Sequence, residues 1–294
     1  RFSYFQNIKV DTKNVGNALS RNSLNSTEIN QPEDPNKWLM RYRLYSIDAD
    51  EVNNIMALSR INPAKLEFDP HHYSYGGGYL YPLGFWFFTL KYAEIVHIGD
   101  MNWMVENPDE MDKIYFAGRI FVLISFFISM LFLFHSIKII QTPKFAFITS
   151  LIYLTVPSLF MFSMVMKPHV YALVWVNIAI FILVRSYSER RFNYKNSINL
   201  GLVLGMAVGS IVTFAGFAVI VWNVLAYLFF KKKIKFLNLL IVPAIACLVF
   251  FIVNPYIILN YDAFLLETAA QKSWFFVELD IKYFWLFILN SLLP

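Results

Sequence analysis

The sequence predicts an all-α, polytopic membrane protein with about seven transmembrane helices and a long external loop that contains short juxtamembrane helices. Hydrophobic residues make up 57% of the 294 residues and charged residues only 15%, a balance that no water-soluble domain of this size shows. The basic residues are concentrated in short connections between apolar runs, as membrane topology requires. This distribution excludes a soluble enzyme and gives no sign of nucleic-acid binding.

The apolar runs indicate where the helices lie. Spans are predicted at about 115–136, 144–165, 169–186, 198–213, 214–230 and 236–254, with a further apolar run from 282 to the end. Residues 79–98 are also apolar, but Pro82, Lys91 and Glu94 interrupt the run. Its purely apolar part is shorter than the ~20 residues that a span needs. We therefore expect a re-entrant or interfacial helix there.

Charges in the connections predict the topology and the division of the chain. The basic residues occupy alternate connections: Lys138 and Lys144, then Arg185, Arg190, Arg191 and Lys195, then Lys231, Lys232, Lys233 and Lys235. The positive-inside rule assigns these connections to the cytoplasm. Residues 1–114 then form an extracytoplasmic first loop, 115–254 a helical core, 255–281 a second external loop, and 282–294 the start of another span. Because the sequence starts at Arg1 and stops within an apolar run, we expect a fragment of a longer protein.

Residues 46–84 form a polar, acidic and aromatic stretch where we expect the chemistry. A short helix is predicted from Ser46, because one face at helical spacing is apolar or small: Val52, Ile55, Met56 and Ser59. Asp48 and Glu51 have the spacing of an N-cap and its N3 partner. At about 100° per residue, Asp50 points roughly 160° away from the apolar face. Asp50 is therefore predicted to be free to meet a substrate.

Five different short motifs follow one another along residues 46–265. They are Asp50-Glu51-Val52, Asp69 to His72 with Tyr81 to Gly84, Tyr115 to Arg119, Gly201 to Ala207, and Asn254-Pro255-Tyr256. This order resembles the GT-C superfamily of membrane glycosyltransferases, which includes protein O-mannosyltransferases and aminoarabinose transferases. Two positions depart from the superfamily pattern. Lys167-Pro168-His169 stands where many members have Lys-Pro-Asp, and Gly209 to Thr213 contains no donor-binding lysine.

The resemblance implies an enzyme that moves a sugar from a polyprenyl-phosphate-linked donor to an acceptor at the extracytoplasmic face. Asp50 is the implied general base, and Glu51 has either a capping or a supporting role. The implied contacts to the donor phosphate are Lys167, Arg119 and His169. The implied substrate-binding residues are His71, His72, Tyr75 and Tyr79. A multi-pass protein of a bacterial or archaeal cytoplasmic membrane is favoured over one of the endoplasmic reticulum, with membrane lipids and an unidentified acceptor as partners.

Each of these assignments has a structural alternative. Asp50 also fits an ordinary solvated helix acid, Lys167 a snorkelling topology residue, and the tyrosines an aromatic belt at the interface. Gly76-Gly77-Gly78 lacks the context of a phosphate loop and is predicted to be flexible or tightly packed.

Two further aspects of function also stay open at this stage. His71, His72 and His169 match no structural zinc spacing, and the single Cys247 adds no ligand set, so no cofactor is assigned and a divalent metal is not favoured. The alternative function is a non-catalytic GT-C-like accessory subunit or scaffold with membrane-protein partners. A transporter is less favoured, because broken helices do not recur in matching halves.

Overall fold

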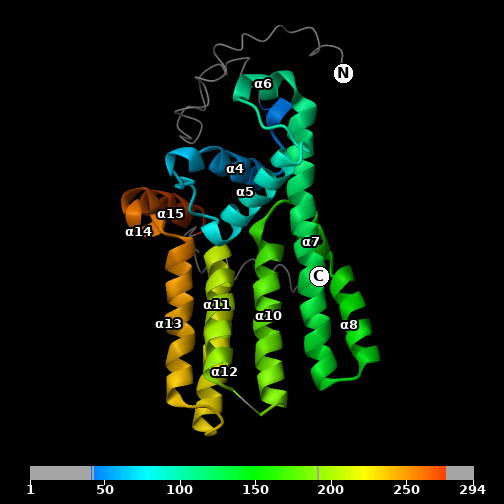
Figure 1. The fold of residues 1–294 in the computed structure, drawn as a ribbon, viewed down its shortest axis with the longest axis vertical. Helices are drawn as coiled ribbons and strands as arrows, with labels where there is room; N and C mark the ends of the chain where they lie inside the picture. Colours follow the sequence, from blue (N-terminus) through cyan, green and yellow to red (C-terminus); the bar gives the residue numbers. More distant parts are fainter. Residues whose placement is uncertain (1–40, 42, 191, 276–294) are drawn as a thin grey trace, which may run out of the picture.

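The computed structural model describes residues 41, 43–190 and 192–275. Most of these residues lie in helices joined by turns and loops, and the β-type pairing among them is one isolated bridge between Asn62 and Glu67. Long helices stand side by side, and short helices form a cap at one end of them (Figure 1). The elements are α4 (Ala49–Ser59), η1 (Pro63–Lys65), α5 (Gly77–Tyr92), α6 (Met101–Glu106), α7 (Pro108–Ile140), α8 (Pro143–Thr155), α9 (Pro157–Ser163), α10 (Pro168–Ser188), α11 (Tyr194–Ser210), η2 (Val212–Phe214), α12 (Ala215–Phe230), α13 (Phe236–Val253), α14 (Tyr256–Leu259) and α15 (Tyr261–Phe275).

The prediction of an all-α membrane protein is confirmed, but the predicted number of spans is not reached in the described residues. Four helices are long and apolar enough to cross a membrane: α7, α10, η2 with α12, and α13. The helix α11 has only 17 residues. Residues 1–40 of the predicted first loop and the predicted span from 282 lie outside the described residues.

The run predicted as one helix over 144–165 is a bent pair. α8 and α9 meet at an angle of 67°. The break falls at Pro157, which has no N–H for a helical hydrogen bond and disfavours helical geometry in the residue before it. Val156 accordingly has extended geometry, with ψ of 114°. The two helices make a fifth span only if the pair is counted as one.

Close packing of α11 against α13 depends on glycines spaced four residues apart. A Cβ added to Gly201 would lie 2.8 Å from the carbonyl oxygen of Val242, and one added to Gly205 would lie 2.7 Å from that of Ala246. Small residues at this spacing let two helix backbones approach closely in a membrane. This contact brings the end of α11 beneath the cap.

The triple glycine joins the cap to this end of α11. The Gly76 N–H donates to the Ser210 carbonyl at 3.0 Å, and the Gly77 N–H donates to Asn254 Oδ1 at 2.8 Å. A Cβ on Gly76 would lie 1.9 Å from the Gly209 carbonyl oxygen. Of the two alternatives predicted for this segment, flexible or tightly packed, the structure has the second.

The cap and the basic connections lie at opposite ends of the long helices. α4, α5 and α6 are at one end, and the connections after α7, α10 and α12 are at the other (Figure 1). α5 has 16 residues, runs obliquely across the ends of the bundle, and does not meet the criteria for a membrane span. Which end faces the cytoplasm stays a prediction from the loop charges.

Candidate functional site

The first turn of α4 carries three carboxylates with different surroundings. Asp48 is the N-cap, as predicted, and its side chain accepts from the Asp50 N–H at 2.9 Å. Of the two roles predicted for Glu51, capping and supporting, the capping role is wrong. Its side chain is fully buried and turns toward α7 and the segment before α10. The packing of α4 against the bundle overrides the local capping pattern.

Glu51 forms what we call the closed cluster, with Arg119, Ser46 and the backbone of Met166. Arg119 donates from Nε to Oε1 at 2.9 Å and from Nη2 to Oε2 at 2.7 Å. The Met166 N–H donates to Oε1 at 2.9 Å, and the Ser46 hydroxyl donates to Oε2. Burial raises the pKa of Glu51, but these hydrogen bonds outweigh burial and hold the pKa below its usual value. The carboxylate is ionised and has no room for a substrate.

Asn54 adds a second clamp on the same backbone segment. Its side-chain amide donates to the Met166 carbonyl at 2.7 Å, while Glu51 accepts from the Met166 N–H. Glu51 and Asn54 lie three residues apart and therefore share a face of α4. Neither Asn54 nor Met166 was predicted from the sequence. The three-residue spacing between Glu51 and Asn54 was the signal that could have identified Asn54. Together the two side chains fix α4 against the turn that carries Lys167.

Lys167 forms what we call the open cluster with Asp48 and Asp50. Its ammonium lies 2.7 Å from Asp50 Oδ2 and 3.0 Å from Asp48 Oδ2. Asp50 is 37% exposed and Lys167 is 17% exposed. Burial lowers the pKa of Lys167, but hydrogen bonds and charge interactions with the two carboxylates outweigh it and raise the pKa. The Lys167 ammonium is therefore held in its charged form, and the cluster is open to solvent through Asp50.

Tyr75 and His169 border the open cluster. Burial raises the pKa of the Tyr75 hydroxyl, and the nearby carboxylates of Asp50 and Asp48 raise it further, so the hydroxyl stays a hydrogen-bond donor. The Tyr75 ring meets His169 edge to face at 6.4 Å, and His169 stacks on Phe162 at 4.9 Å. His169 Nδ1 is buried, and within the part of the chain that the structure describes it has no hydrogen-bond partner.

Glu267 ties α15 to the loop that precedes Tyr75. Its carboxylate accepts from the N–H groups of Tyr73 and Ser74, each at 2.8 Å, and lies 3.3 Å from His72 Nδ1. Burial raises the pKa of Glu267, but hydrogen bonds from His72 and Ser74 outweigh burial and lower the pKa to about 2. His72 is in turn 5.7 Å from the Tyr75 ring. The helix α15 thus contributes a residue to the surroundings of the site, which the sequence did not reveal.

Three predicted site residues have other positions. Tyr79 is fully buried in α5 against Phe121 and Tyr171, so it cannot bind a sugar as predicted. A helix starts at Gly77 and turns Tyr79 inward. His71 is largely exposed and pairs with Asp69 at 3.6 Å, apart from the open cluster. Arg119 is 43% exposed, but Glu51 binds its guanidinium with two hydrogen bonds.

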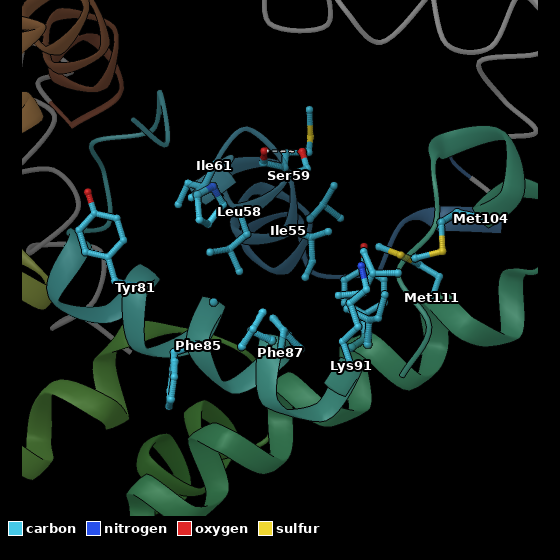
Figure 2. Close-up of a pocket in the computed structure, with 18 of the residues that line it drawn as sticks. Ile55, Leu58, Ser59, Ile61, Tyr81, Phe85, Phe87, Lys91, Met104 and Met111 are labelled. Atoms are coloured by element: carbon cyan, nitrogen blue, oxygen red, sulfur yellow. Dashed lines mark hydrogen bonds between the residues drawn. The ribbon is translucent and has the colours of Figure 1, made fainter. Parts of the chain in front are cut away.

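A large apolar cavity lies on the other side of α4, between α4 and α5 (Figure 2). Its volume is about 1040 Å³. The predicted apolar face of α4 forms one wall, through Val52, Ile55, Met56 and Ser59, and α5 forms another. The amphipathic pattern was thus correct, but it does not reveal that this face borders an unfilled space. α4 therefore separates the apolar cavity from the open cluster.

Metal ligands do not gather in the described residues. Within residues 41, 43–190 and 192–275, no three side chains of His, Cys, Asp or Glu lie close enough together to hold a metal ion.

Comparison with known proteins identifies no family: no family model, no curated protein and no solved structure matches this chain. The arguments for function therefore depend on the residues and on their geometry.

Proposed function

We propose that the chain is an integral-membrane glycosyltransferase, which moves a sugar from a polyprenyl-phosphate-linked donor to an acceptor at the extracytoplasmic face. The observation that carries the proposal is the open cluster. There the accessible carboxylate of Asp50 and the ammonium of Lys167 lie 2.7 Å apart, at the end of the bundle where the short helices form the cap. The proposal includes about seven spans, with α11 and the run from 282 completing the bundle, in a bacterial or archaeal cytoplasmic membrane.

Two requirements of the reaction match the open cluster. The acceptor hydroxyl has to lose a proton as it attacks the anomeric carbon, and a carboxylate on a rigid element can take that proton. Asp50 is such a carboxylate, because the closed cluster and Asn54 fix α4 to the bundle. The donor phosphate needs a cation as the sugar leaves, and the Lys167 ammonium lies 2.7 Å from Asp50.

The donor itself prepares the base in this scheme. Lys167 is bound by Asp48 and Asp50 before the donor arrives. A donor phosphate competes with these carboxylates for the ammonium, because all three are anions that accept charge-assisted hydrogen bonds. Lys167 then keeps Asp48 as a partner and releases Asp50 to accept a proton. The Tyr75 hydroxyl and His169 Nδ1 are the polar groups beside the reacting atoms.

The test is sugar transfer by the Asp50→Asn variant in membranes supplied with polyprenyl-phosphate sugars. We expect transfer to fall by about 10²–10⁴-fold, the usual contribution of a general base. Asp109→Asn is the matched control, because Asp109 is also an acid in the first turn of a helix but is exposed and away from Lys167. Unchanged transfer by Asp50→Asn would overturn the assignment of the base.

A non-catalytic accessory subunit is the second candidate. His169 stands where many members of the GT-C superfamily have an acid, and two carboxylates already bind the ammonium of Lys167. In that case the open cluster is a structural ion pair at a surface that a partner subunit covers. Absence of transfer by the native protein with every donor, together with stable co-purification of another membrane protein, would favour this candidate.

A further inference from the structure

The apolar cavity between α4 and α5 has the size of a binding site for a large ligand. Its volume of about 1040 Å³ is just above the range of about 300–1,000 Å³ of ordinary ligand pockets. In Figure 2 the side chains of Ile55 and Leu58 from α4 face that of Phe87 from α5 across this space, whereas Phe85 points away from α4. Walls of this kind favour hydrocarbon over any polar ligand.

The position of the cavity gives access from the membrane. The cap lies directly at the end of the long apolar helices, and α5 crosses the ends of the bundle (Figure 1). Phe85 and Phe88 line the cavity on α5 and are 68% and 63% exposed. Large apolar side chains at the open side of an apolar pocket are a normal feature of a surface that meets lipid and an unfavourable one for a surface in water.

One cation at the cavity has no acidic partner among the residues that the structure describes. Lys91 lines the cavity from the last turn of α5 and is exposed. The ion pairs found among the described residues do not include Lys91. Asp100 also lines the cavity, but its carboxylate accepts from the Trp103 N–H at 2.8 Å as the N-cap of α6. An ammonium beside hydrocarbon walls complements an anionic lipid headgroup.

We propose that this cavity binds the hydrocarbon chains of an anionic membrane phospholipid, with its phosphate at Lys91. The lipid differs from the sugar donor of the proposed function, because α4 separates the cavity from Asp50 and Lys167. Its chains fill the space against Val52, Ile55 and Met56 and so support α4 from the side opposite to the open cluster. The inference does not depend on transferase activity.

The test is retention of lipid by the purified protein. The protein is reconstituted in nanodiscs of equal amounts of phosphatidylcholine and phosphatidylglycerol, extracted into detergent and analysed by native mass spectrometry. We expect phosphatidylglycerol to be retained about fivefold over phosphatidylcholine, because one lysine contributes about 1 kcal/mol near an anionic surface. Lys91→Glu should abolish this preference, whereas Lys144→Glu, at the opposite end of the bundle, should preserve it. Equal retention of the two lipids by the native protein would overturn the proposal.

A variant that fills the cavity provides a second, independent test of lipid binding. Ile55→Trp places a larger side chain in the space and should remove most of the bound lipid, whereas Phe116→Trp, on the exposed face of α7, should not. Circular dichroism and gel filtration show whether each variant is folded. A folded Ile55→Trp variant that retains lipid as the native protein does would count against the proposal.

A photo-crosslinking residue at Phe88 in the otherwise native chain identifies the occupant even if Ile55→Trp does not fold. An adduct with the mass of a phospholipid supports the proposal. An adduct with a peptide of this chain, such as residues 282–294, or with another protein overturns it.

Discussion

The closed and open clusters start from neighbouring residues of one helix, yet only one of them is available for chemistry. Glu51 is fully buried and accepts hydrogen bonds from Arg119, Ser46 and Met166. Asp50 is 37% exposed and faces a single ammonium. The bundle surrounds one face of α4 and leaves the other open, so the same residue chemistry gives a structural ion pair in one place and an accessible acid in the other.

The difference is one of electrostatic cost. A buried carboxylate is costly unless every lone pair finds a donor, so the closed cluster has to be complete in the native state. A half-exposed carboxylate is solvated by water and exchanges partners at little cost. We therefore expect the closed cluster to control stability and the open cluster to control ligand binding, and the following changes test that division.

Arg119→Met should have the largest effect. It leaves the Glu51 carboxylate buried without its cation, which typically destabilises a protein by about 3–5 kcal/mol. Unfolding in detergent micelles, followed by circular dichroism, measures the change. The control is Arg185→Met, which breaks an exposed pair with Glu189 at 2.7 Å and should cost only about 0.3–0.5 kcal/mol. Similar costs for the two variants would show that the closed cluster has no special structural role.

Because of Glu267, the free energy of unfolding should decrease at acid pH. Its native pKa of about 2 lies below the ordinary value of 4.5, so its contribution is fully present above pH 4.5 and is lost as pH falls toward 2. The shift corresponds to a contribution on the order of 3 kcal/mol. Thermal unfolding between pH 7 and pH 3 measures it, and Glu267→Gln should show a smaller decrease over this range than the native chain. An equal decrease would place the acid sensitivity in another carboxylate.

Lys167→Met should have the smallest effect on stability, about 1 kcal/mol or less, because its partners are partly exposed. The same change should weaken binding of undecaprenyl phosphate by about tenfold or more, since a hydrogen bond to a charged group contributes about 1.5–3 kcal/mol. Lys231→Met, in a connection at the opposite end of the bundle, is the control. A stability loss as large as that of Arg119→Met would mean that the open cluster is structural.

Local patterns in the sequence predicted several features correctly. The apolar runs gave α10, α12 and α13 within about two residues, since each run of that length has to be buried in lipid or protein. They gave only the apolar part of α7, which extends beyond the predicted 115–136 on both sides, from Pro108 to Ile140. Asp48 was recognised as an N-cap, because capping involves only neighbouring backbone groups. The apolar face of α4 was also identified correctly. Pro157, by contrast, broke a run that composition alone had treated as a single helix.

The remaining features required contacts between distant segments. Glu51 and Arg119 are 68 residues apart, and Glu267 reaches Ser74 over 193 residues. No local periodicity encodes such pairs. Tyr79 was misassigned for the same reason, because its burial depends on Phe121 and Tyr171 from other helices.

The sequence by itself determined the membrane class, most helix positions, the cap at Asp48 and the outward direction of Asp50, because each depends on composition or on spacing within one helix. The tertiary structure decided which acid is closed and which is open. It also set Lys167 between Asp48 and Asp50, packed the triple glycine against α11, and left a cavity behind α4. These outcomes depend on how helices pack against one another, and packing is a property of the whole chain rather than of any single segment.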